Sequence, residues 1–324
     1  MKVQKSDNNL EHLAQDFLNA KETEGKSPAT ISFYKQNLER FLWWCKNEGR
    51  SLDVHEIDVR QLRAFLSYVQ KTPKRCFTKP TSPRPLPSMA TLDAYWRSFQ
   101  AFFAWLVTDG LIEADTSPMR KLVRPKVPKK IIQDIPLELI KKALDIWDEK
   151  TLIGARNRAI ILVLLDTGIR VSECAGITLA DVRLGDGLIK VTGKGGNQRI
   201  VRLGEVSGKA LKRYLTLREK YEIESLWIGR DGRPFKKDGI QTMVHRLRKL
   251  GGNVRWSPHT FRNTFSINYL RAGGDPFTLQ ILGGWKDLEM PRRYCAALKV
   301  EDAFAVHKKA SPADQMKRFL ELPE

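Results

Sequence analysis

A proline-rich, basic segment divides this chain into two parts. Residues 115–136 read DTSPMRKLVRPKVPKKIIQDIP, with four prolines and six Lys or Arg. Proline lacks a backbone N–H and breaks helices, so the segment predicts an extended, positively charged linker. A solvated spacer and a linker that follows phosphates both fit it. We therefore expect a first domain over 1–112, a linker over 113–136, a second domain over 137–310 and a tail over 311–324, which could be an inter-subunit helix or fold back on its own domain.

Four stretches before the linker repeat apolar residues at helical spacing. They cover residues 10–17, 28–48, 56–70 and 89–108. Ser27 followed by Pro28, and Ser88 before Met89, are typical helix starts, and Gly49 is a typical stop. Four amphipathic helices in about a hundred residues predict a small helical bundle.

The second part is mostly helical, with one clear β signal. GLIKVTGKGGNQRIVRL, residues 187–203, alternates, turns through Gly193–Gly196 and alternates again. This pattern predicts a hairpin with a glycine-rich tip. The predicted fold class is mainly α: an N-terminal four-helix bundle, then a larger α-helical domain carrying a small β-hairpin or sheet.

The charge balance favours a polyanionic partner. Fifty-six Lys and Arg stand against 37 Asp and Glu, a formal net charge of +19, and nucleic acid is the commonest partner for such a chain. The longest apolar run, AIILVLL at 159–165, is too short to span a bilayer, and the first residues contain no signal-like apolar stretch. The four cysteines form no CxxC pair. We expect a cytoplasmic, DNA-associated protein with no membrane segment, no metal site and no cofactor.

Two motifs in the second part offer basic residues for chemistry. Arg170 follows an apolar helix that ends at Gly168, and Glu173, three residues on, could brace its guanidinium. Taken alone, this is more simply a structural ion pair. Lys194 lies at the hairpin tip between glycines, where it is either an exposed turn residue or a proton donor lowered into a groove.

Two further motifs follow near the end of the chain. In SPHTFRNTF, residues 257–265, His259 and Arg262 share a helix face, which suits an anion whose protons must be managed, although a capping histidine also fits. In LGGWKDLEMPRRYC, residues 282–295, Tyr294 stands behind two arginines and nine residues after Trp285. Tyr294 is either a surface aromatic or a phenol aimed at an anion.

The six residues make sense together around a phosphodiester. A phenol, with a pKa of about 10, is a poor nucleophile until its anion is stabilised. Arginines, a lysine, a histidine and an indole N–H would do this while neutralising charge on a five-coordinate phosphorus. The set is Arg170, Lys194, His259, Arg262, Trp285 and Tyr294.

In order, the motifs TGIRVSE, TGKGG, HTFRNTF and LGGWKDLEMPRRY resemble those of the tyrosine recombinases, the phage-integrase superfamily, over essentially the whole chain. The resemblance implies site-specific DNA recombination through a 3′-phosphotyrosyl intermediate, without metal or ATP, for integration, excision or resolution. It implies that Tyr294 is the nucleophile and Lys194 the general acid for the leaving 5′-hydroxyl. Trp285 takes the place of the family's usual second histidine. Asn263 stands where the family often has a histidine, and this departure concerns a supporting hydrogen bond rather than the reaction.

The resemblance further implies that 1–112 is a core-binding, DNA-clamp domain and 137–310 the catalytic domain. It implies action on double-stranded DNA as a homo-tetramer, with possible accessory DNA-bending or directionality factors. Two alternatives remain: a type IB topoisomerase-like nicking-closing enzyme, and a catalytically silent architectural DNA-binding protein. Phage, transposon, plasmid and chromosomal elements fit equally well. The candidate DNA-contacting residues are Lys35, Arg97, Arg124, Lys126, Lys129 and Lys130.

Overall fold

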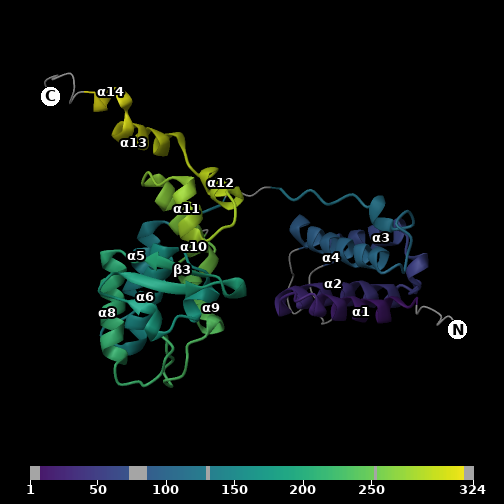
Figure 1. The fold of residues 1–324 in the computed structure, drawn as a ribbon, viewed down its shortest axis with the longest axis horizontal. Helices are drawn as coiled ribbons and strands as arrows, with labels where there is room; N and C mark the ends of the chain where they lie inside the picture. The colour runs from purple at the N-terminus through teal and green to yellow at the C-terminus, as the bar shows by residue number, and fades with distance from the viewer. Residues whose placement is uncertain (1–7, 73–85, 129–131, 252–253, 317–324) are drawn as a thin grey trace. The chain divides into compact units, whose positions relative to one another are not determined.

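The computed structural model describes residues 8–72, 86–128, 132–251 and 254–316, except for the side chains of Lys194 and Gln315. The chain divides into two compact units, Met1–Lys129 and Lys130–Glu324 (Figure 1). No helix in the described ranges is long and apolar enough to cross a membrane.

The first unit is a four-helix bundle, as predicted. Its helices are α1 (Leu10–Thr23), α2 (Pro28–Asn47), α3 (Val59–Lys71) and α4 (Met89–Thr108), with short 3₁₀ turns η1 (Val54–Glu56) and η2 (Pro118–Arg120). The Ser27 hydroxyl accepts a hydrogen bond from the Thr30 amide and so caps α2. Phe41, Phe65 and Phe99 are buried and meet edge to face, with ring centroids 5.0 to 5.8 Å apart. These aromatic contacts fix how the helices pack.

Both ends of the segment predicted as a linker pack onto the units. Met119 and Leu122 are buried in the core of the first unit, and the Trp96 indole N–H donates to the Leu122 carbonyl at 3.0 Å. At the other end, Ile135 is fully buried in the second unit, and its amide donates to the Thr264 hydroxyl at 2.9 Å. The linker between these two packed ends is therefore shorter than the predicted range of 113–136.

The second unit is built around α6 (Leu152–Thr167), whose apolar residues are buried on most sides. The helices packed most extensively with it are α8 (Glu205–Arg218) and α10 (Pro258–Arg271). The others are α5 (Leu137–Asp145), α7 (Val171–Ala175), α9 (Lys237–Arg246), α11 (Pro276–Gly283), α12 (Glu289–Cys295), α13 (Val300–Ala310) and α14 (Pro312–Gln315), with 3₁₀ turns η3 (Leu179–Asp181), η4 (Lys194–Gly196) and η5 (Leu247–Leu250).

In the described part of this unit, one antiparallel sheet contains three strands, in the order β1-β2-β3. The predicted hairpin is confirmed as β2 (Leu188–Thr192) and β3 (Gln198–Arg202), joined through η4. β1 (Val182–Arg183) was not predicted, because two residues are too few to display an alternating pattern.

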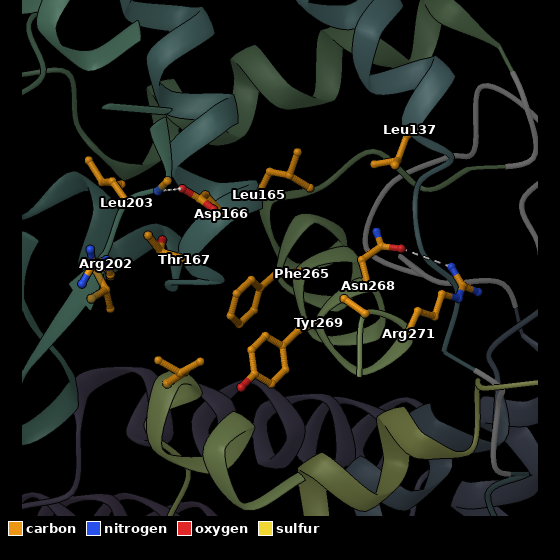
Figure 2. A pocket seen from close by; sticks show the side chains of 14 residues that line it. Leu137, Leu165, Asp166, Thr167, Arg202, Leu203, Phe265, Asn268, Tyr269 and Arg271 are labelled. Carbon is orange, nitrogen blue, oxygen red and sulfur yellow. Dashed lines mark hydrogen bonds between the residues drawn. The ribbon is translucent and has the colours of Figure 1, made fainter. Parts of the chain in front are cut away.

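The three aromatic residues on one side of α10 differ in burial. Phe261 is fully buried, but Phe265 and Tyr269 are only partly buried. Figure 2 shows their rings pointing into a cavity of about 750 Å³, opposite the ends of α6 and β3.

Candidate active site

Arg170 is placed by the abrupt end of α6. Gly168 adopts a left-handed conformation with φ of 59°, and a Cβ there would lie 2.2 Å from the Phe265 ring, so glycine is required. Arg170 then becomes the N-cap of α7. Glu173 accepts hydrogen bonds from the backbone amide and from Nη1 of Arg170, each at 2.8 Å. The predicted bracing of Arg170 by Glu173 is confirmed.

Glu173 is also bound by a second arginine that the sequence analysis had not selected. Arg199, on β3, donates from Nη1 to Oε1 at 3.0 Å and from Nη2 to Oε2 at 2.9 Å. Burial alone would raise the pKa of the Glu173 carboxyl, but the hydrogen bonds from Arg199 and Arg170 lower it to about 2. Glu173 is therefore an anion at any physiological pH.

Lys194 lies in η4, at the tip between β2 and β3. Its backbone is described, whereas its side chain lies outside the described part of the structure, so its chemical role stays a prediction. The preceding residue, Gly193, fixes where the tip begins: a Cβ on Gly193 would lie 3.2 Å from Glu173 Oε1. The base of the tip thus packs on the carboxylate that holds Arg170.

Arg262 is buried and joins two distant segments. Nη1 donates to the Gly168 carbonyl and Nη2 to the Gly283 carbonyl, both at 2.7 Å. Its Cζ lies 4.1 Å from the centroid of the Trp285 ring, a cation–π contact. Burial, and then repulsion from Arg170, lowers the pKa of Arg262 to about 10, so it remains protonated at neutral pH.

Tyr294 is fully buried, so the interpretation as a surface aromatic is wrong. Its hydroxyl donates to Asn263 Oδ1 at 3.2 Å, and its ring centroid lies 5.7 Å from that of Trp285. Burial raises the pKa of Tyr294, while Arg262 and Arg293 act in the opposite direction. The free protein therefore holds Tyr294 as a neutral phenol.

His259 lies at a polar cavity of about 470 Å³, which is also lined by Asn263, Arg255 and Arg293. Its side chain is exposed, yet surrounding protein atoms desolvate it in part. This desolvation, followed by the charges of Arg262 and Arg255, lowers the pKa of His259 below 6.5. The imidazole is neutral at pH 7 and can accept a proton.

The structure thus brings Arg170, Arg262, Trp285 and Tyr294 together, with His259 beside them through Asn263. Arg199 was missed although the sequence contains a signal for it. In the alternation of β3 it falls in phase with Val201, which is buried, and an arginine on an inward face requires a buried acceptor.

The residues proposed to contact DNA lie apart from this site in the sequence, and their role stays a prediction. Lys35 is exposed, with its Nζ 3.9 Å from Glu39. Arg97 and Arg124 both bind the carboxylate of Asp93, at 3.1 and 2.7 Å. Lys126 is exposed, while Lys129 and Lys130 lie outside the described residues.

Fold and site together match one class of protein, the DNA recombinases that use a tyrosine as the nucleophile. The family models agree, since "Phage integrase family" matches residues 135–301 and "Phage integrase, N-terminal SAM-like domain" matches residues 13–113. The chain belongs to the phage integrase family of tyrosine recombinases.

Individual relatives cover nearly the whole chain. The tyrosine recombinase XerD of Listeria innocua serovar 6a is 27% identical over 299 residues, 90% of this chain and 96% of the relative. The fold is similar to that of the XerH site-specific recombinase bound to palindromic difH substrate (TM-score 0.68, 20% identity, 94% of this chain and 84% of the other). It is also similar to that of a lambda integrase tetramer bound to a Holliday junction (TM-score 0.67, 16% identity, 88% and 80%).

Proposed function

We propose that this chain is a site-specific DNA recombinase that cleaves and rejoins DNA through a 3′-phosphotyrosyl bond at Tyr294. The observation that carries the proposal is the burial of Tyr294 against Trp285, which also contacts the guanidinium of Arg262. A structural tyrosine needs no such neighbours, whereas a nucleophile for phosphate needs cations held close to it.

The arginines and the indole act on the charge of the phosphate. Arg170 and Arg262 would bind the non-bridging oxygens of the scissile phosphate. Arg262 uses two of its five N–H groups on carbonyls, which leaves others for the phosphate. The Trp285 N–H would donate a further hydrogen bond. Because all three are positioned before the reaction, they stabilise the five-coordinate phosphorus without reorganisation.

Proton transfers accompany the exchange of one phosphorus–oxygen bond for another. The Tyr294 oxygen forms a bond to phosphorus as the bond to the 5′-oxygen breaks. Asn263 accepts a hydrogen bond from Tyr294 but cannot keep the proton, so His259, neutral and at the same cavity, takes it. Lys194 supplies the proton that the leaving 5′-hydroxyl needs. The reverse reaction, with the 5′-hydroxyl of a partner strand, completes strand exchange.

Assembly as a tetramer on paired DNA sites is also part of the proposal. α13 buries none of its residues, and Val300 and Phe304 are 58% and 65% exposed. An apolar surface of this kind near the end of the chain suits contact with a neighbouring subunit. The tail over 311–324 would continue this contact; residues 317–324 lie outside the described part. A cytoplasmic location and accessory DNA-bending or directionality factors stay predictions.

The test is a covalent-adduct assay in EDTA with nicked duplexes made from the DNA that flanks the gene. Wild-type protein should give, after denaturation and digestion, nucleotide mass on the peptide that contains Tyr294. Tyr294→Phe should give no adduct and still bind DNA, and Tyr221→Phe, in the loop after α8, should behave as wild type. Adduct formation by Tyr294→Phe would contradict the proposal.

Two further assays separate the alternatives. Relaxation of supercoiled DNA without strand exchange would indicate a type IB topoisomerase-like enzyme. Arg170→Ala should lose cleavage in a recombinase, whereas in a silent architectural protein it would change little. DNA binding by wild type without any adduct on the flanking DNA would favour the silent protein.

A further inference from the structure

Arg199 lies where three functional segments of the second unit meet. It is the fifth residue after Lys194, on β3, and in the register of the hairpin it pairs with Val191. Val191 and Val201 are buried on the same side of the sheet, so the backbone directs Arg199 inward. Its side chain is 16% exposed. A guanidinium in this position is committed to partners inside the protein.

Three separate donors of Arg199 are used, and they reach two different segments. Nη1 and Nη2 bind both oxygens of Glu173, and Nε donates to the Leu282 carbonyl at 3.2 Å. Gly284 closes over the same group: a Cβ there would lie 3.1 Å from Arg199 Nε. Among side chains, only a guanidinium has the two Nη donors that bind a carboxylate bidentately and a third donor, Nε, for a carbonyl.

Each partner of Arg199 is itself joined to a predicted catalytic residue. Glu173 binds Arg170 through two hydrogen bonds and contacts Gly193, the residue before Lys194. Leu282 precedes Gly283, whose carbonyl accepts from Arg262. One side chain therefore links the Arg170 turn, the hairpin tip and the end of α11.

We propose that Arg199 is a positioning residue. Through Glu173 and the Leu282 carbonyl, it holds Arg170 at a fixed position relative to the segment that leads to Trp285, and it does not itself contact the scissile phosphate. This inference rests on the proposed function. Lysine at position 199 would keep the charge but could not bind Glu173 bidentately and Leu282 at once. Arg170 would then lose the geometry in which it meets the non-bridging oxygens.

The first test compares two substrates in single-turnover cleavage by Arg199→Lys. One is a nicked duplex whose site is defined by the adducts described above; in the other, a methylphosphonate replaces the scissile phosphate and so removes the charge that Arg170 neutralises. On the phosphodiester we expect a rate about 100-fold below wild type, as misplacement of a catalytic group allows. On the methylphosphonate we expect a rate within about threefold of wild type, because the interaction that is lost has no charge to act on.

Controls separate positioning from folding and from DNA binding. Both rates come from one preparation, so their ratio does not depend on the fraction of folded protein. Arg202→Lys makes the same change on the same strand, at an exposed residue, and should cleave both substrates as wild type. Arg199→Lys should also retain the wild-type affinity for DNA and its salt dependence, since no phosphate contact is removed. Equal slowing on both substrates, no slowing, or a reduced salt slope would overturn the proposal.

The second test needs no cleavage and so stands apart from the proposed function. In free protein, amide hydrogen exchange of peptides covering 190–198 and 279–286 should be faster in Arg199→Lys than in wild type, with peptides of the first unit unchanged. Unchanged exchange in these two peptides would overturn the positioning role. If wild type forms no adduct but exchange rises as expected, the proposed function fails and the structural link stands.

Discussion

Replacing Glu173 by glutamine should destabilise the second unit in a pH-dependent way. The Glu173 side chain is 1% exposed and accepts two hydrogen bonds from Arg170 and two from Arg199. Glutamine keeps the size of the side chain but removes its charge and turns an amide NH₂ toward arginine donors. Two guanidinium groups then lose their shared counter-ion, which is costly when one of them is largely buried.

The pKa of Glu173 sets the magnitude and the pH range. Its lowering from 4.5 to about 2 corresponds, at 1.36 kcal/mol per pKa unit, to about 3 kcal/mol of folding free energy. Because the folded pKa lies below the unfolded one, this stabilisation is fully present above pH 4.5. It is lost as the pH falls toward 2. The difference in stability between wild type and Glu173→Gln should therefore be about 3 kcal/mol at pH 7 and shrink through that window.

Urea unfolding read by pulsed hydrogen exchange and mass spectrometry measures this difference, because peptides report each unit separately. Peptides of the second unit should show the difference at pH 7 and a much smaller one near pH 2.5. Peptides of the first unit serve as an internal control and should unfold alike in both proteins. A difference of the same size at every pH would refute the claim that the charge of Glu173 supplies the stabilisation.

Three other perturbations test separate features of the site and of the first unit. Trp285→Phe keeps a ring beside Arg262 but removes the N–H, so urea stability should change by less than about 1 kcal/mol while single-turnover cleavage slows about 100-fold. NMR titration of free protein should give His259 a pKa below 6.5, and bound DNA phosphates should raise it. A free-state pKa at or above 6.5 would contradict the claim that desolvation and nearby arginine charges act on His259. Arg124→Gln should weaken DNA binding and reduce the slope of log affinity against log salt by about 1; an unchanged slope would exclude Arg124 as a phosphate contact.

Local sequence rules predicted most of the fold. α4 runs from Met89 to Thr108, as expected from Ser88 and the apolar spacing, and α2 begins after Ser27. These elements are specified by neighbouring residues, so spacing and caps suffice. The cavity beside Phe265 and Tyr269 could not be predicted, because a helical face records that a residue is apolar and not whether another segment covers it.

For the site, the sequence predicted six candidate residues and the Arg170–Glu173 contact, but neither Arg199 nor the contacts between distant segments. The Arg262 to Gly168 hydrogen bond spans 94 positions, and no local pattern encodes such a contact. Asn263 was noted only as a departure from the family motif, although it accepts the hydrogen bond of Tyr294. The role of Lys194 still rests on its position in the hairpin motif.

The charges of the site suggest which species it is built to bind most tightly. Arg170 and Arg199 bind the single carboxylate of Glu173, and Arg262 binds the carbonyls of Gly168 and Gly283, so positive charges outnumber negative ones among these four side chains. Their mutual repulsion contributes to the lowered pKa of Arg262. A phosphodiester brings one negative charge, whereas the five-coordinate state in the proposed attack by Tyr294 would carry two. An excess of positive charge that is in place before the reaction favours the more negative transition state over the bound substrate, which is the condition for these arginines to accelerate the reaction as well as bind DNA.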